Sequence, residues 1–232
     1  MLDVSGATLS SVVLGSNAKN AGIVTVTDTG SSAKTFDVTG FGNSALSINA
    51  NGASNANYTV LADSSQTLLS LNLGTSTADT LSILGTTAIA DTFFANKLGM
   101  ETLSLTSSAT FSTLTLGSNA TTSGITTLID ASNSGKTIDI SADTIGTSST
   151  KLSISAGSGS DTVIVNTTQY ATINGNDGSN ILQLSNALTS SESGTTSAIG
   201  NVSYSNISTV QLANSNNTVA LNLDNMIRKG VS

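Results

Sequence analysis

The chain has 232 residues, with 14 Asp and Glu against 7 Lys and Arg, a net charge of −7 at pH 7, and neither His nor Cys. Because phosphate binding needs clustered cations, this balance argues against nucleic acid as a partner. The missing His and Cys remove disulfides, thiolate metal sites, the common zinc ligands and the common general base, so nothing in the composition indicates an enzyme.

Small and polar side chains dominate the composition. Only 9% of the residues are charged and 3% are aromatic, which predicts thin cores of Leu, Ile and Val. There is no Pro against 21 Gly, so Gly, Asn, Asp and Ser must form the turns. The chain has no apolar run long enough to cross a membrane, and its first residues lack the regions of a signal peptide. We therefore expect either another export signal or a fragment of a longer protein.

The clearest feature of the sequence is a long internal repeat. Leu14–Ala18 (LGSNA) recurs as Leu116–Ala120, an offset of 102 (116 − 14). The offset continues through a series of identical residues: Gly22/Gly124, Ile23/Ile125, Asp28/Asp130, Lys34/Lys136, Thr35/Thr137 and Asp37/Asp139. Repeats of this kind indicate a stacked architecture in which each unit buries the apolar face of its neighbour.

The repeat extends further along the chain. Leu46–Ile48 recurs as Leu152–Ile154 at an offset of 106, which predicts a four-residue insertion near Ile145–Ser149. Ile207–Leu212 follows the pattern of Met100–Leu105 and begins a third copy. The predicted organisation is one continuous solenoid over residues 1–232, with repeats of about 2–102 and 103–206 and a partial repeat 207–232.

Apolar residues alternate with polar ones over short runs, which is the pattern of β-strands. Only Ala88–Leu98 has a helical spacing, and we expect one short helix or turn there. In chain order the alternating pairs are Phe36/Val38, Leu103/Leu105, Leu114/Leu116, Ile138/Ile140, Val163/Val165 and Val219/Leu221/Leu223.

The predicted fold is all-β: a right-handed parallel β-solenoid (β-helix or β-roll) of stacked short strands. Clusters of Gly, Asn, Asp and Ser separate the strands, as expected for turns between them. The alternative is a tandem pair of β-sandwich domains, each about a hundred residues long. The low aromatic content argues against sandwiches, whose cores use Trp, Tyr or Phe as anchors.

Two glycine-rich segments carry the predicted chemistry. Residues 156–163 read AGSGSDTV and residues 174–182 read NGNDGSNIL, and both resemble the calcium-binding nonapeptide of RTX proteins. Glycines expose backbone carbonyls and an Asp adds charge, which suits a cation that takes six to eight oxygens. Asp79 lies in a similar turn. The predicted calcium ligands are Asp79, Gly157, Gly159, Asp161, Gly175, Asp177, Gly178 and Asn180; the alternative is that these segments are ordinary glycine-rich turns.

The segments 99–120 and 156–186 resemble the repeat regions of bacterial S-layer proteins of the RTX class. The resemblance implies a secreted structural protein at the bacterial cell surface that assembles with copies of itself and is stabilised by calcium. A large repetitive RTX adhesin that binds a surface or receptor is the alternative. Insertion into a membrane is not expected, and any contact with surface glycan or lipopolysaccharide would involve regions outside this chain.

Two further groups of charged residues are candidates for a chemical role. Asp28, Lys34 and Asp37, repeated as Asp130, Lys136 and Asp139, predict an ion pair across a turn, with a cation site as the alternative. An Asp pair acting as acid and base is the catalytic alternative, but the chain has only two glutamates, Glu101 and Glu192, and no nucleophile motif. The prediction is a protein without enzymatic activity.

Overall fold

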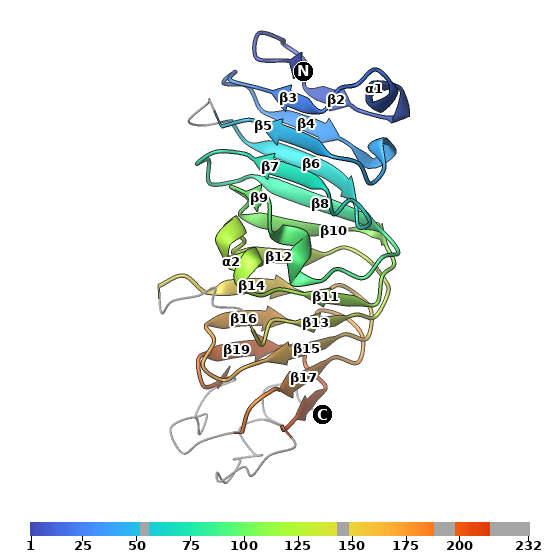
Figure 1. Cartoon of the computed structure of the whole chain (residues 1–232). Helices are drawn as coiled ribbons and strands as arrows, with labels where there is room; N and C mark the ends of the chain where they lie inside the picture. The colour runs from blue at the N-terminus through green and yellow to red at the C-terminus, as the bar shows by residue number, and fades with distance from the viewer. Residues whose placement is uncertain (52–55, 143–148, 188–197, 214–232) are drawn as a thin grey trace.

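The computed structural model describes residues 1–51, 56–142, 149–187 and 198–213. Short parallel strands stack in about eight turns, and few residues are helical. The stack is elongated, with the N-terminus at one end (Figure 1). This arrangement confirms the predicted parallel β-solenoid, and not the alternative of tandem β-sandwich domains.

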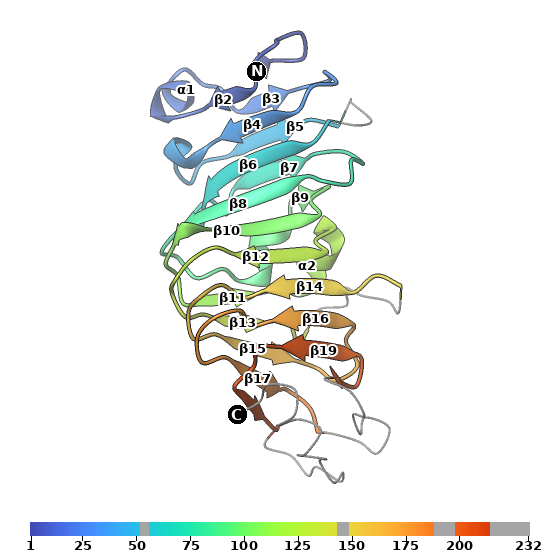
Figure 2. The ribbon, with the colours of Figure 1, turned by 180° about the vertical axis from the view of Figure 1, so that it is seen from behind.

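Sheet B runs through the described part of both repeats. It has ten strands, of which β18 pairs antiparallel with β19 and the others are parallel. Figure 2 shows them stacked one below another. Their bounds are β2 (Ser11–Val13), β4 (Lys34–Asp37), β6 (Tyr58–Asp63), β8 (Thr80–Gly85), β10 (Thr102–Ala109), β12 (Thr127–Asp130), β14 (Leu152–Ser155), β16 (Ala171–Asn174), β18 (Ala198–Ile199) and β19 (Val202–Ser205).

Two shorter sheets complete the turns, one in each repeat. Sheet A accompanies sheet B in the first repeat, and sheet C accompanies it in the second. Sheet A contains β1 (Leu2–Asp3), β3 (Thr25–Thr27), β5 (Leu46–Asn49), β7 (Leu69–Asn72) and β9 (Lys97–Leu98). Sheet C contains β11 (Thr113–Thr115), β13 (Thr137–Asp139), β15 (Thr162–Val165), β17 (Ile181–Leu184) and β20 (Thr209–Gln211).

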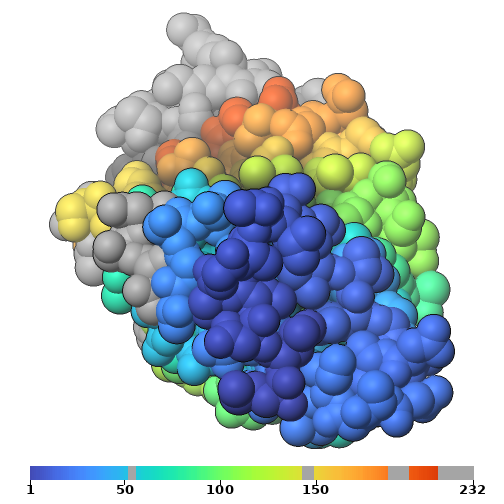
Figure 3. Space-filling view, turned by 90° about the horizontal axis from the view of Figure 1, so that it is seen from above, coloured from blue at the N-terminus to red at the C-terminus, as the bar shows by residue number. Residues whose placement is uncertain are grey.

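Equivalent strands of the two repeats lie in different sheets. At the 102-residue offset, β3 of sheet A corresponds to β12 of sheet B, and β4 of sheet B corresponds to β13 of sheet C. The second repeat is therefore placed one sheet further around the solenoid than the first. Figure 1 shows the consequence, because the two equivalent helices α1 and α2 lie on opposite sides of the stack. Figure 3, viewed from the N-terminal end, shows the first turns lying over the later ones.

The helical segments differ from the sequence prediction. The expected segment Ala88–Leu98 contains the 3-10 helix η2 (Asp91–Phe94), and a second 3-10 helix, η1, spans Thr39–Phe41. Two short α-helices were not predicted: α1 (Ser16–Asn20) and α2 (Ser118–Ser123). Both follow the repeated Leu-Gly, and five or six residues are too few to show a helical period in the sequence.

Apolar side chains from sheet B form one continuous column inside the solenoid. Each is buried and faces its register partner in the neighbouring turn, and burial of such a side chain contributes about 1.5–3 kcal/mol. The column consists of Val12, Phe36, Val60, Leu81, Leu103, Leu128, Ile154, Ile173 and Tyr204. No turn can bury its apolar residues without its neighbours.

A column of hydroxyl side chains occupies the position before each of these buried residues. It faces outward and carries no charge, so sheet B presents a polar but neutral stripe to water. β-branched threonines also suit the exposed face of a strand. The column consists of Ser11, Thr35, Thr59, Thr80, Thr102, Thr127, Ser153, Thr172 and Ser203.

Many strands end in the same turn. An Asp or Asn side chain at or next to the strand end accepts a hydrogen bond from the backbone N–H two residues later, as Asp63 does from Ser65 at 2.9 Å. This local bond turns the chain out of the sheet. Residues that make it include Asp3, Asp28, Asp37, Asp63, Asp130, Asp139, Asn166 and Asn174.

Several sequence predictions concern residues outside the described ranges. The insertion near Ile145–Ser149 falls almost entirely on residues 143–148, and the run Val219/Leu221/Leu223 falls on 214–232. The proposed repeat boundaries, with a partial third copy from residue 207, stay a prediction.

Candidate functional site

Two buried polar corners are the chemically richest parts of the described chain. The AB corner, where the chain passes from sheet A to sheet B, comprises residues 28–34, 73–79 and 99–101. The BC corner, where it passes from sheet B to sheet C, comprises residues 130–136, 156–161 and 175–180. The two are equivalent in the repeat and contain most of the predicted site residues.

Each corner contains a buried ion pair. Lys34 Nζ lies 2.9 Å from Asp28 Oδ2, and Lys136 Nζ lies 3.6 Å from Asp130 Oδ2, with all four side chains fully buried. The structure thus confirms the predicted ion pairs but places them inside the protein. The third predicted member does not join them, since Asp37 accepts hydrogen bonds from the N–H and hydroxyl of Thr39. Its counterpart Asp139 accepts the N–H of Ser141.

Lys136 has further partners inside the BC corner. Its ammonium donates to Ala109 O at 2.9 Å, to Ser132 Oγ at 2.5 Å and to Ser134 O at 3.3 Å. It also lies 5.3 Å from the centre of the Phe111 ring. The ammonium therefore satisfies carbonyl and hydroxyl oxygens of two turns as well as balancing a carboxylate, as a buried charge requires.

Side chains at the corners connect one turn to the preceding turn. The Lys136 N–H donates to Asp161 Oδ1 at 2.7 Å, and the Asp161 N–H donates to Asn180 Oδ1 at 2.9 Å. In the AB corner the Tyr58 N–H donates to Asp79 Oδ1 at 2.6 Å, and the Asp79 N–H donates to Glu101 Oε2 at 2.9 Å. We call this repeated contact the interlock. It satisfies a backbone N–H where the sheet ladder is interrupted.

Asp161 and Asp79 each use only one carboxyl oxygen in the interlock. Both residues are almost fully buried, and within the described ranges their Oδ2 atoms have no hydrogen-bond partner. Burial raises the pKa of Asp161 to about 6, and the charge of Asp130 adds to the rise, although the Lys136 backbone N–H and ammonium oppose it. Burial likewise raises the pKa of Asp79 to about 6, assisted by the charge of Glu101.

The predicted glycines are required by backbone geometry. Gly157 and Gly178 have φ of +84° and +92°, where other residues are strained. A Cβ on Gly159 would lie 2.5 Å from Gly135 N, and one on Gly178 would clash with Gly159 O. A Cβ on Gly175 would likewise clash with Asn206 O. Stacked turns touch through their backbones here, which explains the glycine spacing without a ligand.

Two predicted carboxylate ligands of calcium, Asp161 and Asp177, lie in different surroundings. Asp161 is buried and engaged in the interlock, whereas Asp177 is exposed on the next turn. Over the ranges that the structure describes, no group of three or more Asp, Glu, His or Cys is arranged to hold a metal. Calcium binding by the chain stays a prediction.

Sequence reasoning did not identify Lys97, which is fully buried in the inner column of sheet A opposite Leu71. Its ammonium donates to Leu69 O at 3.0 Å and Phe93 O at 2.6 Å, and lies 4.0 Å from the centre of the Phe93 ring. Burial lowers its pKa to about 8. No periodic pattern or motif identifies this residue, because Lys next to Leu in a strand predicts an ordinary exposed lysine.

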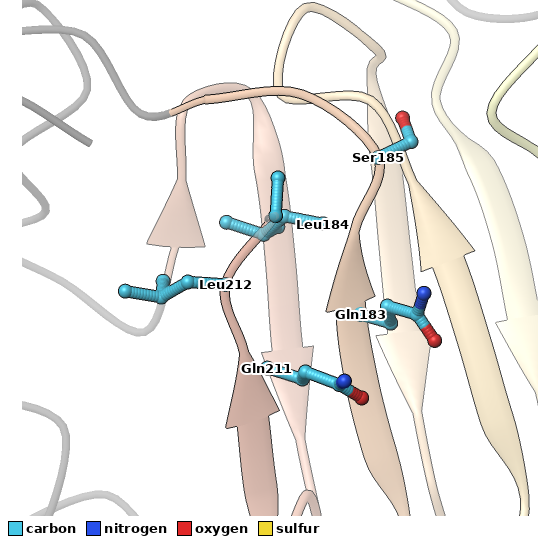
Figure 4. Close-up of a pocket in the computed structure, with 6 residues that line it drawn as sticks. Gln183, Leu184, Ser185, Gln211 and Leu212 are labelled. Carbon is cyan, nitrogen blue, oxygen red and sulfur yellow. The ribbon is translucent and has the colours of Figure 1, made fainter. Parts of the chain in front are cut away.

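The two glutamates and a hollow on sheet C are the remaining candidate features. Glu101 accepts the interlock bond from Asp79, and Glu192 lies outside the described residues. A hollow between β17 and β20 is lined by Gln183, Leu184, Ser185, Gln211, Leu212 and Ala213, none of which titrates near neutral pH (Figure 4). Within the described ranges, no helix is long and apolar enough to cross a membrane.

Comparison with protein-family models, with curated proteins and with solved structures found no match for this chain. The functional inference therefore depends on the residues, the solenoid and the resemblance of the sequence repeats.

Proposed function

We propose that this chain is a structural segment of a secreted bacterial cell-surface protein, of the S-layer or S-layer-like kind, that associates with copies of itself. The observation that carries the proposal is the continuity of sheet B, whose parallel strands join both repeats into one stack. A rod in which every turn is hydrogen-bonded to the next is suited to bearing load in a surface layer. It is less suited to a binding or catalytic site that must open and close.

The interior of the stack supports a structural role. Polar groups at the corners are used to bond neighbouring turns, as in the contacts from Lys136 to Asp161 and from Asp161 to Asn180. Three of the five lysines in the described ranges, Lys34, Lys97 and Lys136, are buried in internal contacts. The outer stripe of sheet B is neutral, so close approach of other chains to it meets little charge repulsion.

The experiment that tests the proposal is sedimentation velocity over a wide range of protein concentration, with negative-stain electron microscopy of the same samples. We expect concentration-dependent oligomers or sheets, strengthened by calcium at about 1–10 mM, which is at or above the dissociation constants of about 0.1–1 mM of extracellular calcium modules. Magnesium at the same concentration is the matched control for ionic strength and charge.

A strict monomer at high concentration, with or without calcium, would contradict self-association. The adhesin alternative would then lead, and binding of the monomer to intact bacterial cells or to isolated surface glycan would be its test.

A further inference from the structure

The two buried ion pairs differ in how the lysine ammonium is held. In the BC corner Lys136 Nζ donates to three oxygens and lies 3.6 Å from Asp130 Oδ2. In the AB corner Lys34 Nζ lies 2.9 Å from Asp28 Oδ2, but within the described ranges neither atom has a hydrogen-bond partner. The ammonium and the carboxyl of the AB corner therefore touch at an angle that does not make a hydrogen bond.

A buried ammonium without hydrogen bonds is costly. Both side chains of the AB pair are fully buried. A charge taken out of water needs hydrogen-bonding oxygens around it as well as a counter-charge, and the Lys34 ammonium has the counter-charge alone over the ranges that the structure describes. A product in which neither group is charged would remove this cost, and the exclusion of water from the corner would oppose its hydrolysis.

The Asp28 carboxyl is held by one of its two oxygens. Oδ1 accepts the Gly30 N–H at 2.9 Å. Gly30 packs against both members of the pair, since a Cβ there would lie 3.0 Å from Asp28 Oδ1 and 3.3 Å from Lys34 Nζ. The Gly30 N–H is placed to stabilise the negative charge that develops on Oδ1 when a nucleophile attacks the carboxyl carbon. Oδ2, the oxygen next to the lysine nitrogen, has no such bond within the described chain.

We infer that Asp28 and Lys34 react with each other in the folded chain and become joined by an amide bond between Asp28 Cγ and Lys34 Nζ. The nitrogen forms the new bond to Cγ, and the bond from Cγ to Oδ2 breaks. Of the three ammonium protons, one stays on the amide nitrogen and two leave with Oδ2 as water. Atoms and charges therefore balance without another reactant, and Oδ1 remains as the amide oxygen that accepts the Gly30 N–H.

The product is a cross-link across the turn between sheets A and B. Asp28 directly follows β3, and Lys34 begins β4. The bond would restrict the unfolded chain and so stabilise the fold, as a disulfide does in other proteins, in a chain that has no Cys. The folded, unlinked chain is the reactant, so the ion pair forms first. The inference does not depend on self-association.

The BC corner is not expected to react. Three hydrogen bonds hold the protons of the Lys136 ammonium, and its nitrogen lies farther from the carboxyl than the nitrogen of Lys34 does. The BC pair is therefore a control inside the same molecule, and each chain should lose one water and not two.

Intact-mass spectrometry of the denatured protein tests the inference. After incubation in the folded state near neutral pH, most molecules should be lighter than the sequence mass by one water molecule, whereas chains kept in urea should keep their full mass. Trypsin locates the loss, because a Lys34 nitrogen in an amide bond blocks cleavage after this residue. Residues 20–97 should then appear as one peptide that lacks one water.

Lys34→Arg is the sharpest variant, because its guanidinium keeps the charge opposite Asp28 but is a poor nucleophile. It should keep its full mass, whereas Lys136→Arg, the matched change in the BC corner, should lose one water as the wild type does. Circular dichroism shows whether each variant is folded, and the time course of the wild type decides the matter if one is not.

Two results would overturn the inference. One is a folded wild type that keeps its full sequence mass throughout the incubation. The other is a loss of water that persists in folded Lys34→Arg or that accompanies normal cleavage after Lys34, because a ring closed elsewhere, for example at Asp177–Gly178, would then account for it.

Discussion

The two repeats place the same residues in different surroundings. The segment LGSNA begins α1 in the first repeat and α2 in the second, but α1 buries none of its residues, whereas α2 buries Ala120 and Ser123. Asp91, from the preceding turn, accepts hydrogen bonds from the N–H groups of Gly117, Asn119 and Ala120. Gly15 and Gly117, the residues directly before the two helices, provide no side-chain cap themselves. The neighbouring turn, and not the repeated sequence, decides how much each of the two helices contributes to the stability of the fold.

The buried ion pairs show the same dependence on neighbours. Asp28 and Lys34 form a close pair at 2.9 Å, whereas Lys136 is shared between Asp130 at 3.6 Å and three other oxygens. A duplicated Asp and Lys therefore balance charge in one corner, and in the other they also connect turns. The change follows from the shift of the second repeat by one sheet, which gives each corner different neighbours.

Truncating the buried lysines should have the largest effect on stability. Lys34→Ala leaves Asp28 buried and unpaired, and Lys136→Ala leaves both Asp130 and the carbonyls of Ala109 and Ser134 without their donor. Each should cost about 3–5 kcal/mol, the usual penalty for breaking a buried pair. Urea unfolding followed by circular dichroism measures both. The double variant Asp28→Asn with Lys34→Met should recover much of the loss, and no recovery would contradict the ion-pair interpretation.

Removing the carboxylate that caps α2 should have an intermediate effect. Asp91→Ala deletes charge-assisted hydrogen bonds to three backbone N–H groups, a loss of about 1.5–3 kcal/mol. Those bonds lower the pKa of Asp91 against the opposing effect of burial, so its contribution is present above about pH 4 and disappears in acid.

Hydrogen exchange separates this local effect from general destabilisation. Amides of Gly117, Asn119 and Ala120 should exchange faster in Asp91→Ala, while the equivalent amides of α1 should be unchanged. Equal acceleration in both helices would show that Asp91 acts on the whole stack.

Substitution of equivalent outward-facing residues should have the smallest effect on stability, and the effect should be the same in both repeats. Thr35 in sheet B and Thr137 in sheet C lie at the 102-residue offset, and both face water. Thr35→Ala and Thr137→Ala should each change stability by no more than about 0.5 kcal/mol, as substitutions away from packed features do. A large effect at Thr137 alone would mean that the hydroxyl on sheet C has a partner that the one on sheet B lacks.

The sequence predicted those features of the fold that follow from a repeated pattern. It did not predict those that depend on which turns are neighbours. Alternating pairs such as Ile138/Ile140 predicted buried strands, and the repeated Asp and Lys predicted the ion pairs. The shift of the second repeat could not be predicted, because turns vary in length, from 19 residues between Ile154 and Ile173 to 31 between Ile173 and Tyr204. An offset of 102 residues therefore does not reveal how many turns it spans.

The predicted calcium motif shows why site prediction was harder than fold prediction. Gly159 and Gly178 match the spacing of a calcium loop, but stacked turns that touch through their backbones require glycine for a different reason. Asp161 fits the calcium motif, but its position is explained equally well by the interlock. Sequence spacing cannot distinguish a carboxyl that accepts a hydrogen bond from a backbone N–H from a carboxyl that binds a cation.

Sheet B runs continuously through both repeats, and a distance measured by pulsed electron paramagnetic resonance tests this continuity most directly. Because the chain has no Cys, spin labels can be placed at Thr35→Cys on β4 and Thr172→Cys on β16 alone. Six strand spacings separate these positions in sheet B, which predicts a narrow distribution centred at about 29 Å between the two backbone sites. A broad distribution, or one centred beyond about 40 Å, would mean that the two repeats do not share one sheet.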